Sequence, residues 1–257
     1  MTAIAHAGYM TGRHMRAMAR QPWYIALTLV QPMIYLLLFG ALFEKATLIP
    51  GFEGDSYLAF LTPGIVVMSA LFSAAWNGMA TLEDLERGTI DRFLVTPVSR
   101  AALIAGPIAQ AAAVVMVQSL IIVGVATVRG ASYDGGVVGI AVMLLASVLL
   151  AVPFAAFSNA VALTSRSREA MIGSVQFIAL PLTFLAAGFM PIDLAPGWIQ
   201  GIARFNPVNW AVEAARAALA VEVDWSFVLI RLGWLALLAA VMGWLATGAF
   251  RAYQKTI

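Results

Sequence analysis

Six apolar stretches alternate with short polar segments along this chain of 257 residues. A helix rises ~1.5 Å per residue and needs about 20 apolar residues to cross a bilayer core, which each stretch supplies. Only 11% of the residues are charged, whereas globular domains carry about 25%. We therefore predict an all-α polytopic membrane protein with six transmembrane helices in a single transmembrane domain, residues 1–257. The predicted spans are about 23–43, 57–79, 103–128, 137–164, 170–190 and 227–250.

The orientation follows from lysine and arginine, which gather in cytoplasmic loops. One set of connecting segments holds Arg13, Arg16, Arg20, Arg87, Arg92, Arg100, Arg166, Arg168, Arg251 and Lys255, and the other holds Lys45, Arg129, Arg204, Arg216 and Arg231. The richer set includes both termini. We therefore predict a multi-pass protein of the cell membrane with both termini cytoplasmic, and aromatic residues near the span ends, such as Trp23, Tyr57 and Trp225, are typical of membrane interfaces.

Two segments outside the spans have helical patterns. Arg13, Arg16 and Arg20 share one face of residues 2–22, which favours an amphipathic helix lying on the inner leaflet; a disordered basic tail that only enforces topology is the alternative. In the outer segment 191–226, Asn206 is a candidate N-cap and Pro207 a first helical residue.

The helix that Asn206 and Pro207 would start, residues 208–221, is too short and too polar to span. We predict that it dips into the outer interface or lies along it. Glu213 and Arg216 are three residues apart on this helix, so they are expected to neutralise each other.

A dense run of charge, residues 83–92, separates the second and third spans. Glu83 and Arg87, and then Arg87 and Asp91, are spaced four residues apart, which favours a helix that Pro97 would end. An apolar face of such a helix could enter a groove of a partner protein; a solvated loop cap is the alternative. The candidate docking residues are Leu82, Glu83, Leu85, Glu86, Arg87, Gly88, Asp91 and Arg92.

Several functional classes lack their signatures. Neither lysine, Lys45 nor Lys255, follows glycine as a phosphate-binding loop requires, so ATP hydrolysis by that route is excluded. The span interiors hold no Asp, Glu or Lys, which disfavours an ion-driven carrier. A His-Glu-x-x-His zinc motif is absent, cysteine is absent, and no metal site is expected. The net charge of +2 gives no reason to expect nucleic acid binding.

Polar residues inside the spans need hydrogen-bond partners. Bonds between helices are the more favoured role, and contact with a transported substrate is the alternative. The candidates for lining a path are Gln31, Asn77, Gln118, Asn159 and Gln176.

Two blocks resemble a known family. Glu86-Arg87-Gly88-Thr89-Ile90-Asp91-Arg92-Phe93-Leu94-Val95-Thr96-Pro97 is similar to the cytoplasmic signature of type-2 ABC exporter permeases, which include the daunorubicin/doxorubicin resistance permeases. Residues 181–192, 196–199 and 206–216 resemble the end-of-chain pattern of the same family. The blocks lie in order, and with six spans the resemblance covers essentially the whole chain.

The resemblance implies a transmembrane subunit that exports a hydrophobic or amphipathic substrate, such as a drug, a lipid or a lipid-linked glycan. Two permease chains, identical or similar, would form the path, and two cytoplasmic ATPase subunits would bind ATP and Mg beneath them. Residues 82–94 would be the coupling helix, the basic N-terminal helix a second ATPase contact, and the outer segment a re-entrant cap. The chain would not be an enzyme by itself. An ion-driven carrier and a non-transporting scaffold or immunity protein are the alternatives.

Overall fold

The computed structural model describes residues 22–45, 56–88 and 100–254, and within these ranges the chain is helical, with no strand. The helices are α2 (Pro22–Ile34), the π-helix η1 (Tyr35–Phe39), α3 (Gly40–Leu42), α4 (Tyr57–Ala75), α5 (Gly78–Glu86), α7 (Arg100–Val128), α8 (Gly136–Ser165), α9 (Arg168–Phe184), the short 3₁₀ helix η3 (Ile192–Leu194), α10 (Gly197–Ala203), α11 (Pro207–Leu219) and α12 (Trp225–Gln254).

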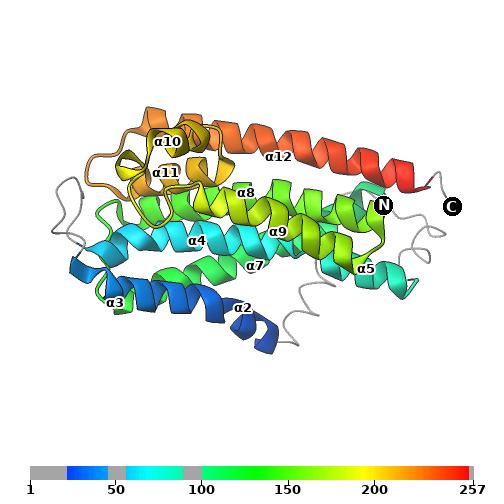
Figure 1. The fold of residues 1–257 in the computed structure, drawn as a ribbon, viewed down its shortest axis with the longest axis horizontal. Coiled ribbons are helices and arrows are strands. Elements are labelled where there is room, and N and C mark those ends of the chain that lie inside the picture. The colour runs from blue at the N-terminus through cyan, green and yellow to red at the C-terminus, as the bar shows by residue number, and fades with distance from the viewer. Residues whose placement is uncertain (1–21, 46–55, 89–99, 255–257) are drawn as a thin grey trace.

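The long helices run side by side along the longest axis of the molecule (Figure 1). Helix α8 is the centre of the bundle, because α4, α7, α11 and α12 all pack against it. Helices α10 and α11 lie together at one end of the bundle, and α5 and the last turns of α12 lie at the other (Figure 1). Among the described residues, the two predicted sets of connecting segments thus lie at opposite ends of the bundle.

Four helical stretches are long and apolar enough to cross a membrane: Tyr57–Glu86, Ala105–Val128, Gly136–Ser165 and Trp225–Gly248. They match four of the six predicted spans. The predicted first span corresponds to a shorter apolar helix, Ala26–Leu42. The predicted fifth span corresponds to α9, which has 17 residues. Four spans are therefore supported by length and composition, and six remain a prediction.

The outer faces of several helices are apolar. Large side chains that the bundle leaves more than half exposed include Leu27 on α2, Leu38 on η1, Phe177 on α9, and Leu229 and Trp244 on α12. Apolar surface of this extent is unfavourable in water and is expected against lipid. The pattern supports the prediction of a membrane protein.

The predicted second span is interrupted near its C-terminal end. Trp76 and Asn77 form a turn between α4 and α5, and central helix α8 supplies the hydrogen bonds there. Ser158 Oγ accepts from Gly78 N at 2.9 Å and donates to Ala75 O at 2.5 Å. Gly78 allows this close approach, because a Cβ there would lie 2.3 Å from Ser158 O.

Helix α11 begins as predicted, since the Asn206 side chain accepts from Val208 N and Pro207 is the first helical residue. It packs deeply against α8 and α12, and its location at the outer interface stays a prediction. A Cβ at Gly135 or Gly139 would lie 2.1 or 2.3 Å from Ala218 O, so glycine permits this approach. Helix α11 is therefore part of the core of the bundle.

Candidate functional site

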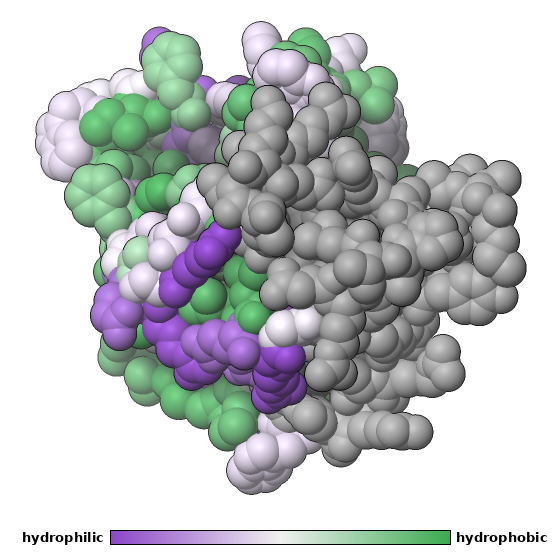
Figure 2. Space-filling view, turned by 90° about the vertical axis from the view of Figure 1, so that its right-hand side faces the viewer, coloured by the Kyte–Doolittle hydropathy of each residue, from purple (hydrophilic) through white to green (hydrophobic). Residues whose placement is uncertain are grey.

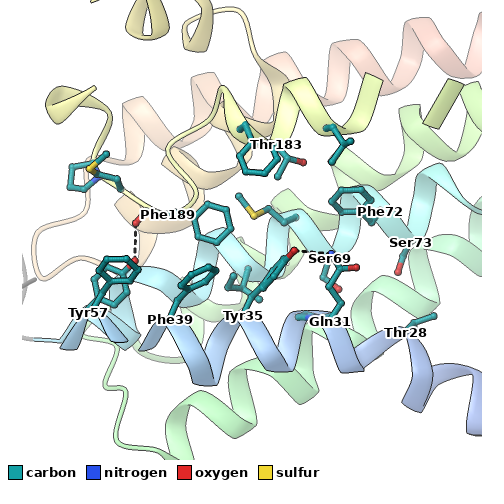
Figure 3. Close-up of a pocket in the computed structure, with 18 of the residues that line it drawn as sticks. Thr28, Gln31, Tyr35, Phe39, Tyr57, Ser69, Phe72, Ser73, Thr183 and Phe189 are labelled. Atoms are coloured by element: carbon teal, nitrogen blue, oxygen red, sulfur yellow. Dashed lines mark hydrogen bonds between the residues drawn. The ribbon is translucent and has the colours of Figure 1, made fainter. Parts of the chain in front are cut away.

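A cavity of ≈ 670 Å³ opens between α2 with η1, α4, and the end of α9 (Figure 3). None of the described residues that line it carries a charged side chain. A space of this size is within the usual range of ligand pockets, which are mostly apolar with a few placed polar groups. The residues that line it are Thr28, Gln31, Pro32, Tyr35, Phe39, Phe43, Tyr57, Ile65, Met68, Ser69, Phe72, Ser73, Trp76, Leu180, Thr183, Phe184, Phe189, Met190, Pro191 and Leu194.

Aromatic rings crowd the end of the cavity nearest α3 (Figure 3). Phe189 meets the Phe39 ring edge-on at 5.4 Å between centroids and the Tyr35 ring at 6.1 Å. The Phe39 ring lies 5.8 Å from the Phe43 ring, which lies 5.7 Å from that of Tyr57. Edge-to-face pairs of this kind are stabilising beyond the area they bury. The rings narrow the cavity at this end.

Hydroxyl and amide groups line the opposite part. Gln118 of α7 lies behind the wall and is 1% exposed. Its Nε2 donates to Thr28 Oγ1 at 2.7 Å, and its Oε1 accepts from Ser73 Oγ at 2.6 Å. Gln31 Nε2 donates to the Tyr35 hydroxyl at 3.1 Å (Figure 3). The cavity wall is therefore amphipathic, because hydroxyl and amide groups lie among aromatic rings, as Ser73 does beside Phe72 (Figure 3).

The five predicted path residues have different positions. Gln31 lines the cavity, and Gln118 supports two residues that do. Asn159 Nδ2 donates to Asn77 Oδ1 at 3.0 Å, and Asn159 Oδ1 accepts from Thr81, so this pair joins α8 to the α4–α5 turn. Gln176 is exposed on α9. For Asn77 and Asn159 the structure shows hydrogen bonds between helices, the role that the sequence favoured.

A non-helical segment, residues 185–191, follows α9 and is called here the strap. The predicted span 170–190 is wrong in its last part, because α9 ends at Phe184. The Asn206 side chain donates to Leu182 O at 2.7 Å and to Leu185 O at 2.9 Å, and Asn209 Oδ1 accepts from Ala187 N at 2.9 Å. These bonds satisfy backbone groups that a continued helix would have paired, as irregular backbone at membrane depth requires.

Arg216 joins the strap to α4. Its Nη2 donates to Gly188 O at 3.0 Å, its Nε donates to Phe60 O at 3.3 Å, and its guanidinium carbon lies 3.6 Å from the centre of the Phe60 ring. The Tyr57 hydroxyl donates to Phe189 O at 3.0 Å (Figure 3). A Cβ at Gly64 would lie 2.1 Å from Gly188 O, so the strap crosses α4 in contact with its backbone.

The predicted partner of Glu213 is wrong. Glu213 forms its ion pair with Arg231 of α12 at 2.7 Å, and its other oxygen accepts from Asn209 Nδ2. The hydrogen bonds of the Arg216 guanidinium go to the backbone carbonyls of Phe60 and Gly188, and it also lies over the Phe60 ring. Both members of the Glu213–Arg231 pair are about one-fifth exposed, and the pair continues through Asn209 to the strap.

The end of the bundle where α5 lies carries the charged run. Hydrophilic side chains gather there beside hydrophobic surface (Figure 2). Glu83, Glu86 and Arg87 are exposed, and Arg87 pairs with Glu83 at 3.5 Å as the spacing predicted.

Arg168 at the start of α9 forms an ion pair with Glu86 through two hydrogen bonds. Glu86 raises the pKa of Arg168 through these bonds, and the Ser167 hydroxyl lowers the pKa of Glu169 by donating to it.

The single helix predicted for residues 82–94 is corrected in two ways. Helix α5 begins earlier, at Gly78, and ends at Glu86. Gly88 then has φ +64°, a conformation that favours glycine and stops a helix. Leu82, a predicted docking residue, is buried against Ala162 and Met171, so it anchors α5 to the bundle. Leu85 is partly buried beside it.

Some predicted residues lie outside the described ranges. These are Asp91 and Arg92 of the docking set, and Arg13, Arg16 and Arg20 of the N-terminal helix. Within the described ranges, no group of three or more His, Asp or Glu side chains could hold a metal ion.

The aromatic end of the cavity was not predicted from the sequence. Tyr35, Phe39 and Phe43 recur every four residues, a spacing that places them on one helix face. That spacing could have indicated a lined surface. Tyr57 was predicted as an interface anchor, whereas it lines the cavity and bonds to the strap.

The chain was also compared with known proteins. The sequence profile of the family described as "ABC-2 type transporter" matches residues 6–220. A putative transport permease ycf38 of Pyropia yezoensis is 28% identical over 84% of this chain and 74% of its own length. The daunorubicin resistance ABC transporter permease protein DrrB1 of Streptomyces coeruleorubidus is 26% identical over 84% and 75%. The inner membrane transport permease YadH of Escherichia coli K12 is 25% identical over 74% of each.

The matched region covers the helices from α2 to α11, the residues that line the cavity and α5 at the charged end. The chain therefore belongs to the ABC-2 type transporter family.

Proposed function

We propose that this chain is the transmembrane permease subunit of an ATP-driven exporter in the cell membrane. A separate pair of ATPase subunits would bind ATP and Mg and supply the energy. Both termini and the α5 end would face the cytoplasm, where the ATPase binds, and the α11 end would face outward. Family membership supports the permease role, and the observation that carries the proposal is the cavity between α2, α4 and α9.

The cavity supports a substrate that is hydrophobic or amphipathic. Its wall combines aromatic rings with a few hydroxyl and amide groups, and the lining residues that the structure describes are all uncharged. A bare anionic group would find no cation among these residues, and desolvating it unpaired is costly. The part of the substrate that enters this cavity would therefore be uncharged or aromatic. Relatives named for daunorubicin resistance support a drug-like substrate, and a lipid or lipid-linked glycan is the alternative.

The α5 end is proposed as the docking surface for the ATPase. Glu83, Glu86 and Arg87 are exposed there, and α5 connects through the Trp76–Asn77 turn to α4, which forms one wall of the cavity. A displacement of α5 by the ATPase would therefore be transmitted through this turn to α4 and to the cavity wall. A second permease chain would complete the route along the cavity's open side, where α2 and α9 expose Ile34, Leu180 and Phe184.

Capture of an ATPase tests this proposal. The detergent-solubilised chain is used to pull down ATP-binding subunits from its own cell, beside Arg87→Glu and the control Arg129→Glu, an exposed arginine at the opposite end. The expected result is specific capture of one ATPase, lost with Arg87→Glu and kept with Arg129→Glu. Capture that survives Arg87→Glu would remove α5 as the docking surface. Failure of the folded wild-type chain to capture any ATPase would favour the ion-driven carrier or the scaffold.

A further inference from the structure

The strap (residues 185–191) is bonded to two different parts of the bundle. Asn206 and Asn209, from the start of α11, bond to backbone groups of Leu185 and Ala187. These bonds hold the strap to α11. Because α11 packs closely on α8 through Gly135 and Gly139, the strap and α11 form one firmly held unit.

A second set of bonds holds this unit to α4. The Tyr57 hydroxyl donates to Phe189 O, and the Arg216 guanidinium donates to Phe60 O while it covers the Phe60 ring. Phe60 and Tyr57 both belong to the first turn of α4. These contacts differ from those within the unit, because separating α4 from the strap would break them and leave the Asn206 and Asn209 bonds intact.

The two sets of bonds fix the direction of the Phe189 ring. With Phe189 O held by Tyr57 and Gly188 O held by Arg216, the ring packs edge-on against Phe39 and Tyr35 (Figure 3). Phe39 and Tyr35 belong to η1, and α2 with η1 packs more lightly on the bundle than α4, α7 or α8 does. At one end of the cavity, the Phe189 ring therefore connects two elements. One is the strap, which is bonded to α11 and α4, and the other is η1, which packs only lightly on the bundle.

We propose that Arg216 and Tyr57 are positioning residues that hold Phe189 across the α11 end of the cavity, and that the strap is the gate through which a substrate leaves. The inference rests on the proposed export function only for the direction in which the substrate moves, which is outward. The gate opens when η1 moves away from Phe189, or when the strap separates from the first turn of α4. Arg216 suits this role because one planar guanidinium can reach Phe60 O and Gly188 O at once.

Cysteine accessibility tests the gate, because the chain contains no cysteine. Ser69→Cys places a single thiol on the cavity wall, where Ser69 is 8% exposed. The full chain is reconstituted in liposomes and treated with a charged, membrane-impermeant thiol reagent. Arg204→Cys, an exposed position beside α11, shows which side of the membrane the α11 end faces.

The expected result is slow labelling of Ser69→Cys from the α11 side. Adding Tyr57→Phe raises that rate by about fivefold, and adding Arg216→Gln raises it by about tenfold or more, since each lost hydrogen bond shifts an equilibrium by roughly this factor. Tyr133→Phe is the matched control, because its hydroxyl has no hydrogen bond to the strap among the described residues. It leaves the rate unchanged.

A second reporter separates gating from a general loss of structure. Ser147 lies in the core on α8 and is fully buried, so Ser147→Cys labels slowly in every variant. Three results would overturn the proposal. One is fast labelling of Ser69→Cys without a second substitution, and another is a labelling rate that neither Tyr57→Phe nor Arg216→Gln raises. The third is an equal increase in the labelling rate of Ser147→Cys. The measurement needs neither ATPase nor substrate, so a working gate in a chain that captures no ATPase would refute the proposed function alone.

Discussion

Arg168 at the start of α9 and Glu86 at the end of α5 form a two-point ion pair, with Nε 3.0 Å from Oε1 and Nη2 2.5 Å from Oε2. The pair links the proposed docking element to the helix whose far end, Leu180 to Phe184, lines the cavity. Both side chains are about half exposed, so water screens the pair and its contribution to stability is small. Because of this position, we propose that the pair transmits movement of α5 to α9 and so to the cavity.

Charge reversal at this pair is expected to reduce transport and leave stability nearly unchanged. Glu86→Arg and Arg168→Glu each place like charges together, which separates α5 from α9, and the double exchange restores the pair. ATP-driven transport in vesicles should fall in each single variant and recover in the double variant, with thermal unfolding similar in all three. If the double variant transports no better than the singles, Glu86 acts on the ATPase and not on Arg168.

The buried pair Glu213–Arg231 should behave in the opposite way, because it is mostly shielded from water. Arg231→Met leaves the Glu213 carboxylate without its cation, and removing one partner of a buried pair costs about 3–5 kcal/mol. The double variant Glu213→Gln/Arg231→Met avoids the unpaired charge and should be the more stable. Thermal unfolding in detergent measures both, and equal unfolding temperatures for the single and double variants would contradict the pairing.

The crossing of the strap over α4 gives a steric prediction. Gly64→Ala places a Cβ 2.1 Å from Gly188 O, which forces the backbones apart and should cost about 1–3 kcal/mol, as overpacking typically does. Gly173→Ala on α9 is the matched control, since its Cβ meets no atom within 4 Å, and alanine favours a helix over glycine. Thermal unfolding should fall for Gly64→Ala and hold or rise for Gly173→Ala; a fall of equal size in both would argue against the close crossing.

The polar part of the cavity depends on Gln118, which bonds to Thr28 and Ser73. Gln118→Leu removes both bonds without changing a residue that lines the cavity. The Thr28 and Ser73 hydroxyls then lose the hydrogen bonds to Gln118 that orient them. The KM for transport of a fluorescent aromatic amphiphile should rise about fivefold, the effect of roughly one hydrogen bond. Gln110→Leu, the same change elsewhere on α7, removes an amide oxygen with no partner among the described residues and should leave the KM unchanged. Equal effects of both substitutions would indicate a change in α7 packing.

Local signals in the sequence predicted much of the helical framework. The apolar runs predicted α7, α8 and α12 within a few residues, and the Asn206-Pro207 signal predicted the start of α11. Each of these signals lies within the element that it predicts. The charge spacing also predicted the Arg87–Glu83 pair, because its partners are four residues apart on one helix.

Tertiary contacts decided the features that sequence reasoning missed. The strap is apolar and reads as the end of a span, but Asn206, Asn209 and Arg216 hold its backbone out of a helix. Those side chains lie about 20 residues or more further along the chain. The α4–α5 turn likewise depends on Ser158, which is 80 residues from Gly78. The partner of Glu213 was missed because Arg231 lies on another helix.

ATP-driven transport by the reconstituted complex tests the central claim most directly. The chain and the ATPase that it captures are placed together in liposomes, and movement of a fluorescent aromatic amphiphile is followed with ATP and Mg supplied on the ATPase side. The account predicts transport that requires ATP hydrolysis, that an uncoupler does not abolish, and that stops when Ser69→Trp fills the cavity. Transport that continues without the ATPase and collapses with the uncoupler would contradict it.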